Sequence, residues 1–145
     1  MITETLERIA QSHGLLAVYL FGSQAESASR YLQGKAFRPE AASELDVAVV
    51  FNSFKENNIR AYAELYAQLA AIFEPFEVDL VFAQEHDALF QYQVIRGIRI
   101  YHSEQTSRGC DYEEAVMRMA DDLSYKKKIM MNEIMEAIED GYFRF

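Results

Sequence analysis

Cysteine and proline are scarce in this sequence, and their scarcity limits what the chain can be. The 145 residues include one cysteine, Cys110, so no disulfide can form within the chain and a reducing compartment is its natural setting. Two prolines and six glycines are scattered without a linker-like cluster, and no internal repeat is present. Hydrophobic residues make up 50% of the chain, enough for one core. We therefore expect a single domain over residues 1–145.

Basic residues are in the minority. The sequence has 14 lysines and arginines against 23 aspartates and glutamates, a formal net charge of −9. Proteins that bind duplex nucleic acid normally carry the opposite balance, so we expect no such partner. A nucleotide is still compatible with this charge, because bound divalent metal ions supply positive charge locally.

Long apolar runs are missing as well. The longest, Leu15–Phe21, is far shorter than the roughly 20 residues that cross a bilayer as a helix. The segment Met1–Arg8 carries Glu4 and Glu7, and it lacks the basic start and apolar stretch of a signal peptide. These absences predict a cytoplasmic protein that does not enter a membrane.

The hydrophobic pattern predicts alternating helices and strands. Continuous apolar runs favour buried strands, whereas apolar residues three and four apart favour helices. Pro75 and Gly97 end elements, and Asn57 or Asn58 can cap the helix that follows them. Helices are predicted at residues 3–12, 57–73, 87–96 and 111–140, strands at Leu15–Phe21, Glu44–Phe51, Glu77–Phe82 and Ile98–Tyr101, and a short helix followed by a loop at residues 24–42. This order indicates an α/β fold with a central sheet flanked by helices.

The last predicted helix, at about residues 111–140 after Gly109, is unusually long. It contains neither proline nor glycine, and its apolar residues follow helical spacing from Tyr112 to Ile138. At 1.5 Å per residue it would be about 45 Å long, more than a domain of this size can cover. Either the helix breaks near Ser124, or part of its apolar stripe meets another protein.

A Gly-Ser pair follows the first predicted strand. Gly22 and Ser23 can open a helix, where free backbone N–H groups and the helix dipole favour a phosphate. Glycine lets a phosphate approach the backbone closely, and the serine hydroxyl adds one donor. A strand that simply turns through Gly-Ser has the same sequence, so this pair alone does not define a site.

Three acidic residues occur in two later strands. Glu44 and Asp46 are separated by Leu45, so strand alternation places both carboxylates on one face. Asp79 lies among apolar residues that suggest burial, where an isolated carboxylate is costly. Mg²⁺ prefers such oxygen ligands and binds one or two carboxylates together with substrate phosphates. The alternatives are a strand that enters from solvent, and an edge strand that exposes Asp79 together with Glu77.

Together, these features resemble the nucleotidyltransferases of the DNA polymerase beta superfamily, whose signature is Gly-Ser, then Asp-x-Asp, then a third Asp. The resemblance extends from Leu15 to Tyr101, and Ser43 and the VDLVF run at residues 78–82 add to it. It implies a polymerase-beta-like fold with a small mixed sheet. The chain is similar in character to the minimal nucleotidyltransferases of prokaryotes, including antitoxins paired with HEPN-domain toxins. Some of that group are similar to AMP-transferases that modify a tyrosine on the partner.

The resemblance implies a role for each of these residues. Gly22 and Ser23 would hold the triphosphate of ATP or another nucleoside triphosphate. Glu44, Asp46 and Asp79 would be the catalytic residues and would ligate two Mg²⁺ ions, and Asp79 would help take the proton from the attacking hydroxyl. The expected reaction moves AMP, or another NMP, to a hydroxyl of a partner protein. That partner would be a HEPN-type toxin, with self-association through the C-terminal helix as a further possibility.

A second hypothesis is a catalytically silent domain of this fold that neutralises its partner by contact alone. Glu44, which stands where the family has aspartate, favours it, as does Glu26, near the position where many active members carry a basic residue. Asp46 and Asp79, both present, favour the enzyme. A third and lesser hypothesis is transfer to a small molecule such as an aminoglycoside, which usually requires an added acceptor-binding domain.

The stretch between Ser23 and Glu44 is about twice as long as in the family. Arg30, Lys35 and Arg38 lie in it. It would form either a flap that restores positive charge at the site or a loop without a role.

Overall fold

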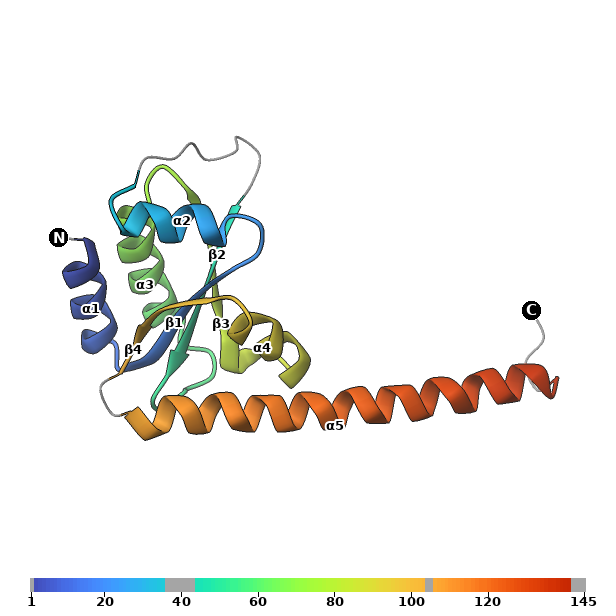
Figure 1. The fold of residues 1–145 in the computed structure, drawn as a ribbon. Coiled ribbons are helices and arrows are strands. Elements are labelled where there is room, and N and C mark those ends of the chain that lie inside the picture. Colours follow the sequence, from blue (N-terminus) through green and yellow to red (C-terminus); the bar gives the residue numbers. More distant parts are fainter. Residues whose placement is uncertain (1, 36–43, 104–105, 142–145) are drawn as a thin grey trace.

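The computed structural model describes residues 2–35, 44–103 and 106–141, and its elements follow the predicted order (Figure 1). They are α1 (Ile2–Ser12), β1 (Leu15–Phe21), α2 (Ala25–Leu32), β2 (Glu44–Phe51), α3 (Ile59–Ile72), β3 (Glu77–Phe82), the 3-10 turn η1 (Ala83–Glu85), α4 (Ala88–Ile95), β4 (Ile98–His102) and α5 (Thr106–Glu139). The predicted class of a central sheet flanked by helices is confirmed, and β1, β2 and β3 have the predicted bounds. The loop predicted after α2 lies mostly outside the described residues.

The four strands form one mixed sheet in the order β3-β2-β1-β4. β1 pairs antiparallel with β2 and with β4, whereas β2 and β3 are parallel. The inner strands β1 and β2 are covered on both faces, which explains their continuous apolar runs. β3 is an edge strand and alternates between exposed and buried residues. The sheet edge at β3 therefore offers polar side chains to solvent.

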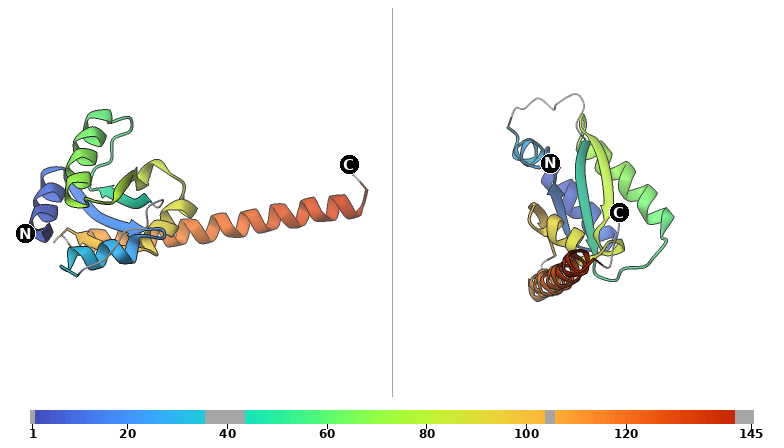
Figure 2. Two further views of the ribbon diagram at one scale, coloured as in Figure 1. Left: turned by 90° about the horizontal axis from the view of Figure 1, so that it is seen from above. Right: turned by 90° about the vertical axis from the view of Figure 1, so that its right-hand side faces the viewer.

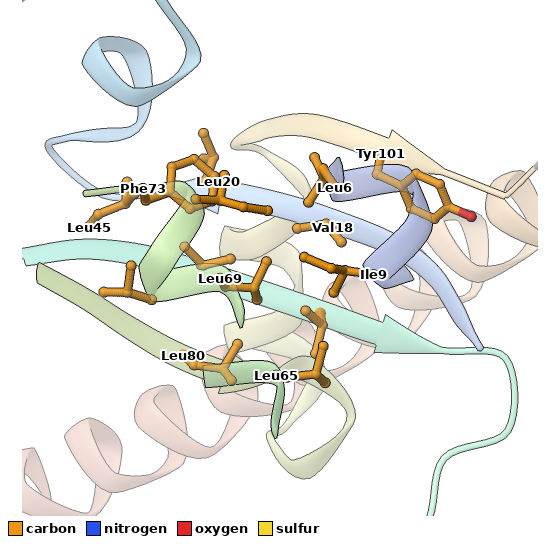
Figure 3. Packing of buried hydrophobic residues seen from close by; sticks show 14 of the residues in the cluster. Leu6, Ile9, Val18, Leu20, Leu45, Leu65, Leu69, Phe73, Leu80 and Tyr101 are labelled. Atoms are coloured by element: carbon orange, nitrogen blue, oxygen red, sulfur yellow. The ribbon is translucent and has the colours of Figure 1, made fainter. Parts of the chain in front are cut away.

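Helices cover the two faces of this sheet unequally (Figures 1 and 2). The larger core lies on the face covered by α1, α2 and α3, and residues such as Leu20, Leu65 and Leu69 form its centre (Figure 3). Leu65, Leu69 and Ile72 recur at helical spacing, so α3 presents one apolar side to the strands. A smaller cluster, which includes Tyr19, lies between the other face and α4 with α5.

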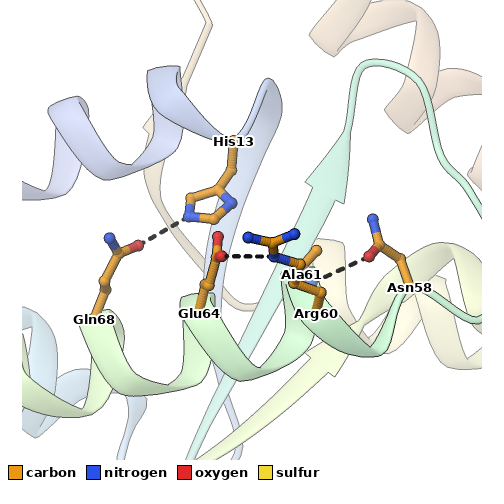
Figure 4. A network of polar contacts seen from close by, with 6 residues as sticks. All are labelled: His13, Asn58, Arg60, Ala61, Glu64 and Gln68. Atoms are coloured by element: carbon orange, nitrogen blue, oxygen red, sulfur yellow. Dashed lines mark hydrogen bonds and ion pairs between the residues drawn. The ribbon is translucent and has the colours of Figure 1, made fainter.

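Polar contacts at the surface join α1 to α3 (Figure 4). The His13 ring nitrogen Nε2, just beyond the end of α1, lies 2.9 Å from Oε1 of Gln68 on α3. The Asn58 side-chain oxygen accepts a hydrogen bond of 3.1 Å from the backbone N–H of Ala61. One of two adjacent asparagines was predicted to cap this helix, and Asn58 is the one that does so.

The C-terminal helix α5 is continuous over its 34 residues. This confirms the predicted long C-terminal helix and excludes the alternative of a break near Ser124. Gly109, expected to precede the helix, lies inside it, where a single glycine costs only about 1 kcal/mol. Val116 and Ala120 are buried against the domain. Beyond them the helix extends away from the rest of the chain (Figures 1 and 2). The remaining alternative from the sequence is that part of the apolar stripe of α5 meets another protein.

A buried tyrosine anchors α5 to the sheet. The Tyr19 hydroxyl donates a hydrogen bond of 2.5 Å to Oε1 of Glu113, and Nη1 of Arg99 lies 3.2 Å from the same oxygen. Burial raises the pKa of Tyr19, and its bond to Glu113 raises this pKa further, so the hydroxyl keeps its proton. Tyr112 of α5 donates a second hydrogen bond, of 2.7 Å, to Oε1 of Gln91 on α4.

Removing the anchoring hydroxyl is expected to destabilise the domain. Tyr19→Phe keeps the ring and deletes a buried hydrogen bond to a charged group, which should lower the free energy of unfolding by about 2 kcal/mol. Tyr62→Phe is the matched control, because the Tyr62 hydroxyl bonds the Leu80 carbonyl at 3.2 Å from a partly exposed position. It should cost only about 0.5 kcal/mol. Urea denaturation would measure both, and equal losses would contradict an anchoring role for Tyr19.

Candidate active site

The Gly-Ser turn and the acidic residues meet at one end of the sheet. β1 ends there at Phe21 and leads into Gly22, while β2 and β3 run in the opposite direction and begin there. The strand register places Asp46 opposite Phe21 on one side and opposite Asp79 on the other. Three segments that are distant in the sequence are thereby brought to one place, as the family resemblance implies.

Asp46 stands at the centre of this end. Its neighbours Leu45 and Val47 are buried in the larger core, so strand alternation directs Asp46 to the other face of the sheet. Asp79 lies opposite Asp46 in the parallel register of β2 and β3, close enough for the two carboxyl groups to influence one another. Burial raises the pKa of Asp46 above its ordinary value, and the charges of Asp79 and Glu44 raise it further. A cation at this position would relieve the repulsion among these groups.

Asp79 is exposed, so the expectation that it is buried is wrong. Its apolar neighbours Val78 and Leu80 point into the core, whereas Asp79 and Glu77 point away from it, because β3 lies at the edge of the sheet. This is the alternative in which an edge strand shows both acids to solvent. The parallel register also pairs Glu77 with Glu44. Four carboxylates therefore lie on the same face, and sequence reasoning did not assign the fourth, that of Glu77, to the site.

The Gly-Ser turn packs directly on Asp46. Gly22 has a φ of +77°, and a Cβ atom on it would lie 2.3 Å from Oδ2 of Asp46. Only glycine satisfies both the backbone conformation and this close approach. Ser23 is exposed, and α2 begins at Ala25 with a hydrogen bond of 3.4 Å from its N–H to the Gly22 carbonyl. The pair thus opens a helix, as predicted.

Gln24 is a residue that sequence reasoning did not place at the site. Its side chain is 3% exposed, and its Oε1 atom has no hydrogen-bond partner among the described residues. A buried polar atom without a partner costs about 1–3 kcal/mol, so such atoms are uncommon away from functional sites. No sequence signal separates this glutamine from one that faces solvent.

Asp46 and Asp79, the acidic pair, suit a magnesium ion. The three predicted ligands, which include Glu44 as well, do not come together. Among the residues that the structure describes, no group of three acidic, histidine or cysteine side chains is close enough to hold a metal. Asp46 and Asp79 alone supply two carboxylates, which is what Mg²⁺ takes from a protein when substrate phosphates provide other oxygens. Glu44 is exposed on the same face, and its role as a ligand stays a prediction.

The raised pKa of Asp46 predicts an effect of pH on stability. The pKa of Asp46 is higher in the folded protein than in the unfolded chain, where it is near 3.8. Protonation of Asp46 therefore favours the folded state at low pH, and this stabilisation is lost as pH rises through the folded pKa. At neutral pH the ionised carboxylate therefore destabilises the protein. Asp46→Asn, measured by urea denaturation with EDTA present, should be more stable than wild type at pH about 7–8. The difference should shrink as pH falls.

An exposed carboxylate offers the control for that experiment. Asp111→Asn changes a solvent-facing aspartate near the start of α5, away from Asp46, and should not make the protein more stable than the wild type at pH about 7–8. If Asp46→Asn were less stable than wild type at neutral pH, the burial of the ionised Asp46 carboxylate and its repulsion by Asp79 would not be the dominant effects.

A hollow of about 760 Å³ lies elsewhere, between α1 and α3, and residues such as Ile9, Tyr31 and Ile72 line it. It opens on the face opposite to the one toward which Asp46 points. The acidic end of the sheet is instead an open surface, since Glu44, Ser23 and Asp79 are all exposed.

No helix among the described residues has the length and apolar character needed to cross a membrane.

Comparisons with known proteins agree with this arrangement. Residues 4–106 match the family model described as Polymerase beta, Nucleotidyltransferase. No curated protein matches the chain. Among solved structures, a toxin–antitoxin complex with AMP-PNP is 21% identical with a TM-score of 0.61, and the match covers 93% of this chain and 99% of that chain.

Two further structures are similar over the same length. The toxin–antitoxin MntA–HepT is 18% identical with a TM-score of 0.60, covering 92% of this chain and 97% of that chain. The complex of the tri-AMPylated HEPN toxin of Shewanella oneidensis with its MNT antitoxin is 18% identical with a TM-score of 0.59, covering 92% of this chain and 96% of that chain. At such identities the likeness shows a shared fold. With the family match, it shows that the chain belongs to the polymerase beta nucleotidyltransferase family.

Proposed function

We propose that this chain transfers AMP from ATP to a hydroxyl group of a partner protein, and that it is the antitoxin of a HEPN-type toxin. The observation that carries the proposal is the meeting of three elements at one point: Asp46 and Asp79 lie side by side on β2 and β3, and Gly22 packs on Asp46. This combination puts a phosphate-accepting turn beside two metal-binding carboxylates. In this proposal residues 1–145 act as one domain, in the cytoplasm where ATP is available.

Each residue of the site has a role in the proposal. The backbone N–H groups at Gly22 and Ser23, together with the Ser23 hydroxyl, bind the triphosphate at the start of α2. Asp46 and Asp79 would hold Mg²⁺ between them, and Glu44, exposed on the same face, would be the third ligand that a second ion requires. When bound, the ions neutralise phosphate charge and make the acceptor hydroxyl easier to deprotonate. The protein contributes position and charge compensation, which are the main requirements of phosphoryl-type transfer.

The reaction exchanges one phosphorus–oxygen bond for another. The acceptor oxygen forms a bond to the α-phosphorus of ATP, and the bond from that phosphorus to the oxygen bridging to the β-phosphate breaks, so pyrophosphate leaves. The proton of the acceptor hydroxyl passes to the carboxylate of Asp79. The exposure of Asp79 suits this task, because the carboxylate can reach a group that arrives from solvent.

Two observations favour a protein as acceptor. The acidic end of the sheet is an open surface rather than a closed pocket for a small substrate, because Ser23, Glu44 and Asp79 are exposed. In addition, one structure of the same fold is a complex of an AMPylated HEPN toxin with its antitoxin. A tyrosine hydroxyl is the acceptor that the family resemblance suggests.

A labelling experiment tests the proposal. A HEPN-type toxin encoded beside this chain would be incubated with it, Mg²⁺ and ATP labelled at the α-phosphate. We expect the label on the toxin, located on a hydroxyl side chain by mass spectrometry, and no label when EDTA is present. Neutralisation of the toxin without any label, and unchanged by Asp46→Asn, would instead show that contact alone is sufficient.

A further inference from the structure

Helix α3 exposes a face that carries no charged side chain. The charged and amide side chains of this helix, those of Arg60, Glu64 and Gln68, recur every four residues along the side that meets His13 (Figure 4). Another side of α3 packs on the sheet in the larger core. The remaining side is exposed, and we define it as the outer face of α3, formed by Ile59, Tyr62, Ala63, Tyr66 and Ala67.

The large side chains of the outer face are open to solvent. Ile59 is 80% exposed, Tyr66 is 42% exposed and Tyr62 is 39% exposed. The rings of Tyr62 and Tyr66 stack on one another, with centroids 6.3 Å apart and planes 16° apart. A surface helix normally carries polar residues on the side opposite to the core. An exposed face of stacked aromatic and aliphatic side chains is instead typical of a protein-binding surface, where tyrosine is enriched.

The outer face adjoins the proposed catalytic residues, because α3 packs against the edge strand β3 (Figures 1 and 2). The Tyr62 hydroxyl donates a hydrogen bond of 3.2 Å to the carbonyl of Leu80, the residue after Asp79. Burial raises the pKa of Tyr62, and Asp79, Tyr66 and Glu85 raise it further through their charges. Asp79 and Glu85 thus lie within electrostatic range of the outer face.

The position beside Asp79 indicates which protein occupies the outer face. In the proposed transfer, the acceptor hydroxyl gives its proton to Asp79, which is exposed on β3. No strand of the described chain lies beyond β3, so the acceptor protein reaches Asp79 across this edge of the sheet. A protein in that place lies next to α3.

The charges around the outer face describe the surface that fits it. Three exposed acidic residues lie on β3 and in the turn after it, namely Glu77, Asp79 and Glu85. Along the other border, Arg60 forms an ion pair of 3.4 Å with Glu64, and before the helix Lys55 and Glu56 carry opposite charges. The surroundings are therefore net acidic. A second copy of this chain would offer the same acids or a neutral border, whereas a partner with basic residues would pair with the acids of β3.

We infer that the outer face of α3 is the surface on which the acceptor protein docks, and that this protein meets it with an apolar patch bordered by basic residues. The inference rests on the proposed function, because the occupant is identified by its need to reach Asp79. It adds the place of docking, which lies outside the residues that bind ATP and metal.

Binding of the HEPN-type toxin used in the labelling experiment tests the inference. Tyr66→Glu puts a charge in the outer face and should weaken binding of the toxin by at least about 100-fold. Gln68→Glu is the matched control, because it adds the same charge to an exposed position of the same helix, two residues further and on the opposite side. It should leave binding as in the wild type. Both variants should bind ATP with Mg²⁺ as the wild type does in calorimetric titration, which also shows that they are folded.

The kinetics of labelling and the effect of salt provide two further readouts. Tyr66→Glu should raise the KM for the toxin by at least about 100-fold and leave kcat within about threefold of the wild type, because docking and not chemistry is changed. Binding of the toxin by the wild type should weaken as NaCl is raised from about 50 to about 300 mM, since salt screens the contact of basic residues with the acids of β3.

Four results would overturn the inference. They are a wild type that does not bind the toxin, a Tyr66→Glu variant that binds it as tightly as the wild type, an equal loss of binding in Gln68→Glu, and a wild-type dimer in sedimentation velocity that Tyr66→Glu dissociates. The last would assign the outer face to a second copy of the chain. Failure of the proposed function is distinct: the toxin would then bind through Tyr66 without receiving label.

Discussion

Asp46→Asn is expected to lower the rate of nucleotide transfer by at least about a thousandfold while the fold stays intact. Asparagine has nearly the same shape, but it removes the negative charge that the proposed magnesium ions require, and charge compensation provides much of the catalysis in such sites. The measurement is the initial rate of AMP incorporation into the partner. Thermal unfolding of the same sample would confirm that the variant is folded.

Asp79→Asn should reduce transfer to a similar extent, because the two carboxyl groups act as one pair. The control is Asp111→Asn, which removes an exposed carboxylate from α5 and should leave the rate as in the wild type. If Asp46→Asn kept more than about a tenth of the wild-type rate, the acidic pair would not be the catalytic centre.

Gly22→Ala is expected to separate activity from stability. The added Cβ atom would lie 2.3 Å from Oδ2 of Asp46, so the carboxylate has to move aside. The end of a short side chain can rotate at modest cost, so most of the loss of stability, about 1–2 kcal/mol, should come from the positive φ of 77°. Displacing a catalytic group by about 1 Å should lower the rate of transfer by at least about 100-fold.

Gly14→Ala is the matched control for this substitution. Gly14 also has a positive φ, of 66°, but a Cβ atom there would meet nothing within 4 Å. The two variants should therefore lose similar free energy of unfolding in urea denaturation, whereas only Gly22→Ala should lose activity. Full activity of Gly22→Ala would contradict the close approach of the Gly-Ser turn to Asp46.

The central part of the fold could be predicted from the sequence because local and tertiary preferences agree there. The runs Leu15–Phe21 and Glu44–Phe51 are apolar throughout, and the inner strands of a sheet covered on both faces need this pattern. The strand bounds follow from it. The Gly-Ser turn and the acid-x-acid pattern flank these strands; the family resemblance implied that they form one site, and the antiparallel pairing of β1 with β2 brings them together.

The exposure of Asp79 could not be predicted with the same certainty, because it depends on strand order. The run Glu77–Phe82 fits both an inner and an edge strand, and only the pairing of β3 with β2 alone decides between them. The burial of Gln24 Oε1 without a hydrogen-bond partner among the described residues arises from tertiary packing, and so does the contact of Gly22 with Asp46. No pattern along the chain encodes them.

The sequence predicted a long C-terminal helix but left open whether it is continuous. The alternative of a break near Ser124 rested on the size of the domain and not on any residue that interrupts a helix. The segment has good helix formers on both sides of Ser124, and Gly109 alone does not stop it. The helix continues beyond Ala120, its last buried residue, and this part of its apolar side is left uncovered by the described residues.

Calorimetric titration of ATP tests the central claim, a metal-dependent nucleotide site built on Asp46, most directly. The titration would be made into the wild type and Asp46→Asn, each with Mg²⁺ and then with EDTA. We predict binding to the wild type with Mg²⁺ and none in the other three titrations. Absence of binding to the wild type in Mg²⁺, or equal binding by Asp46→Asn, would contradict the claim.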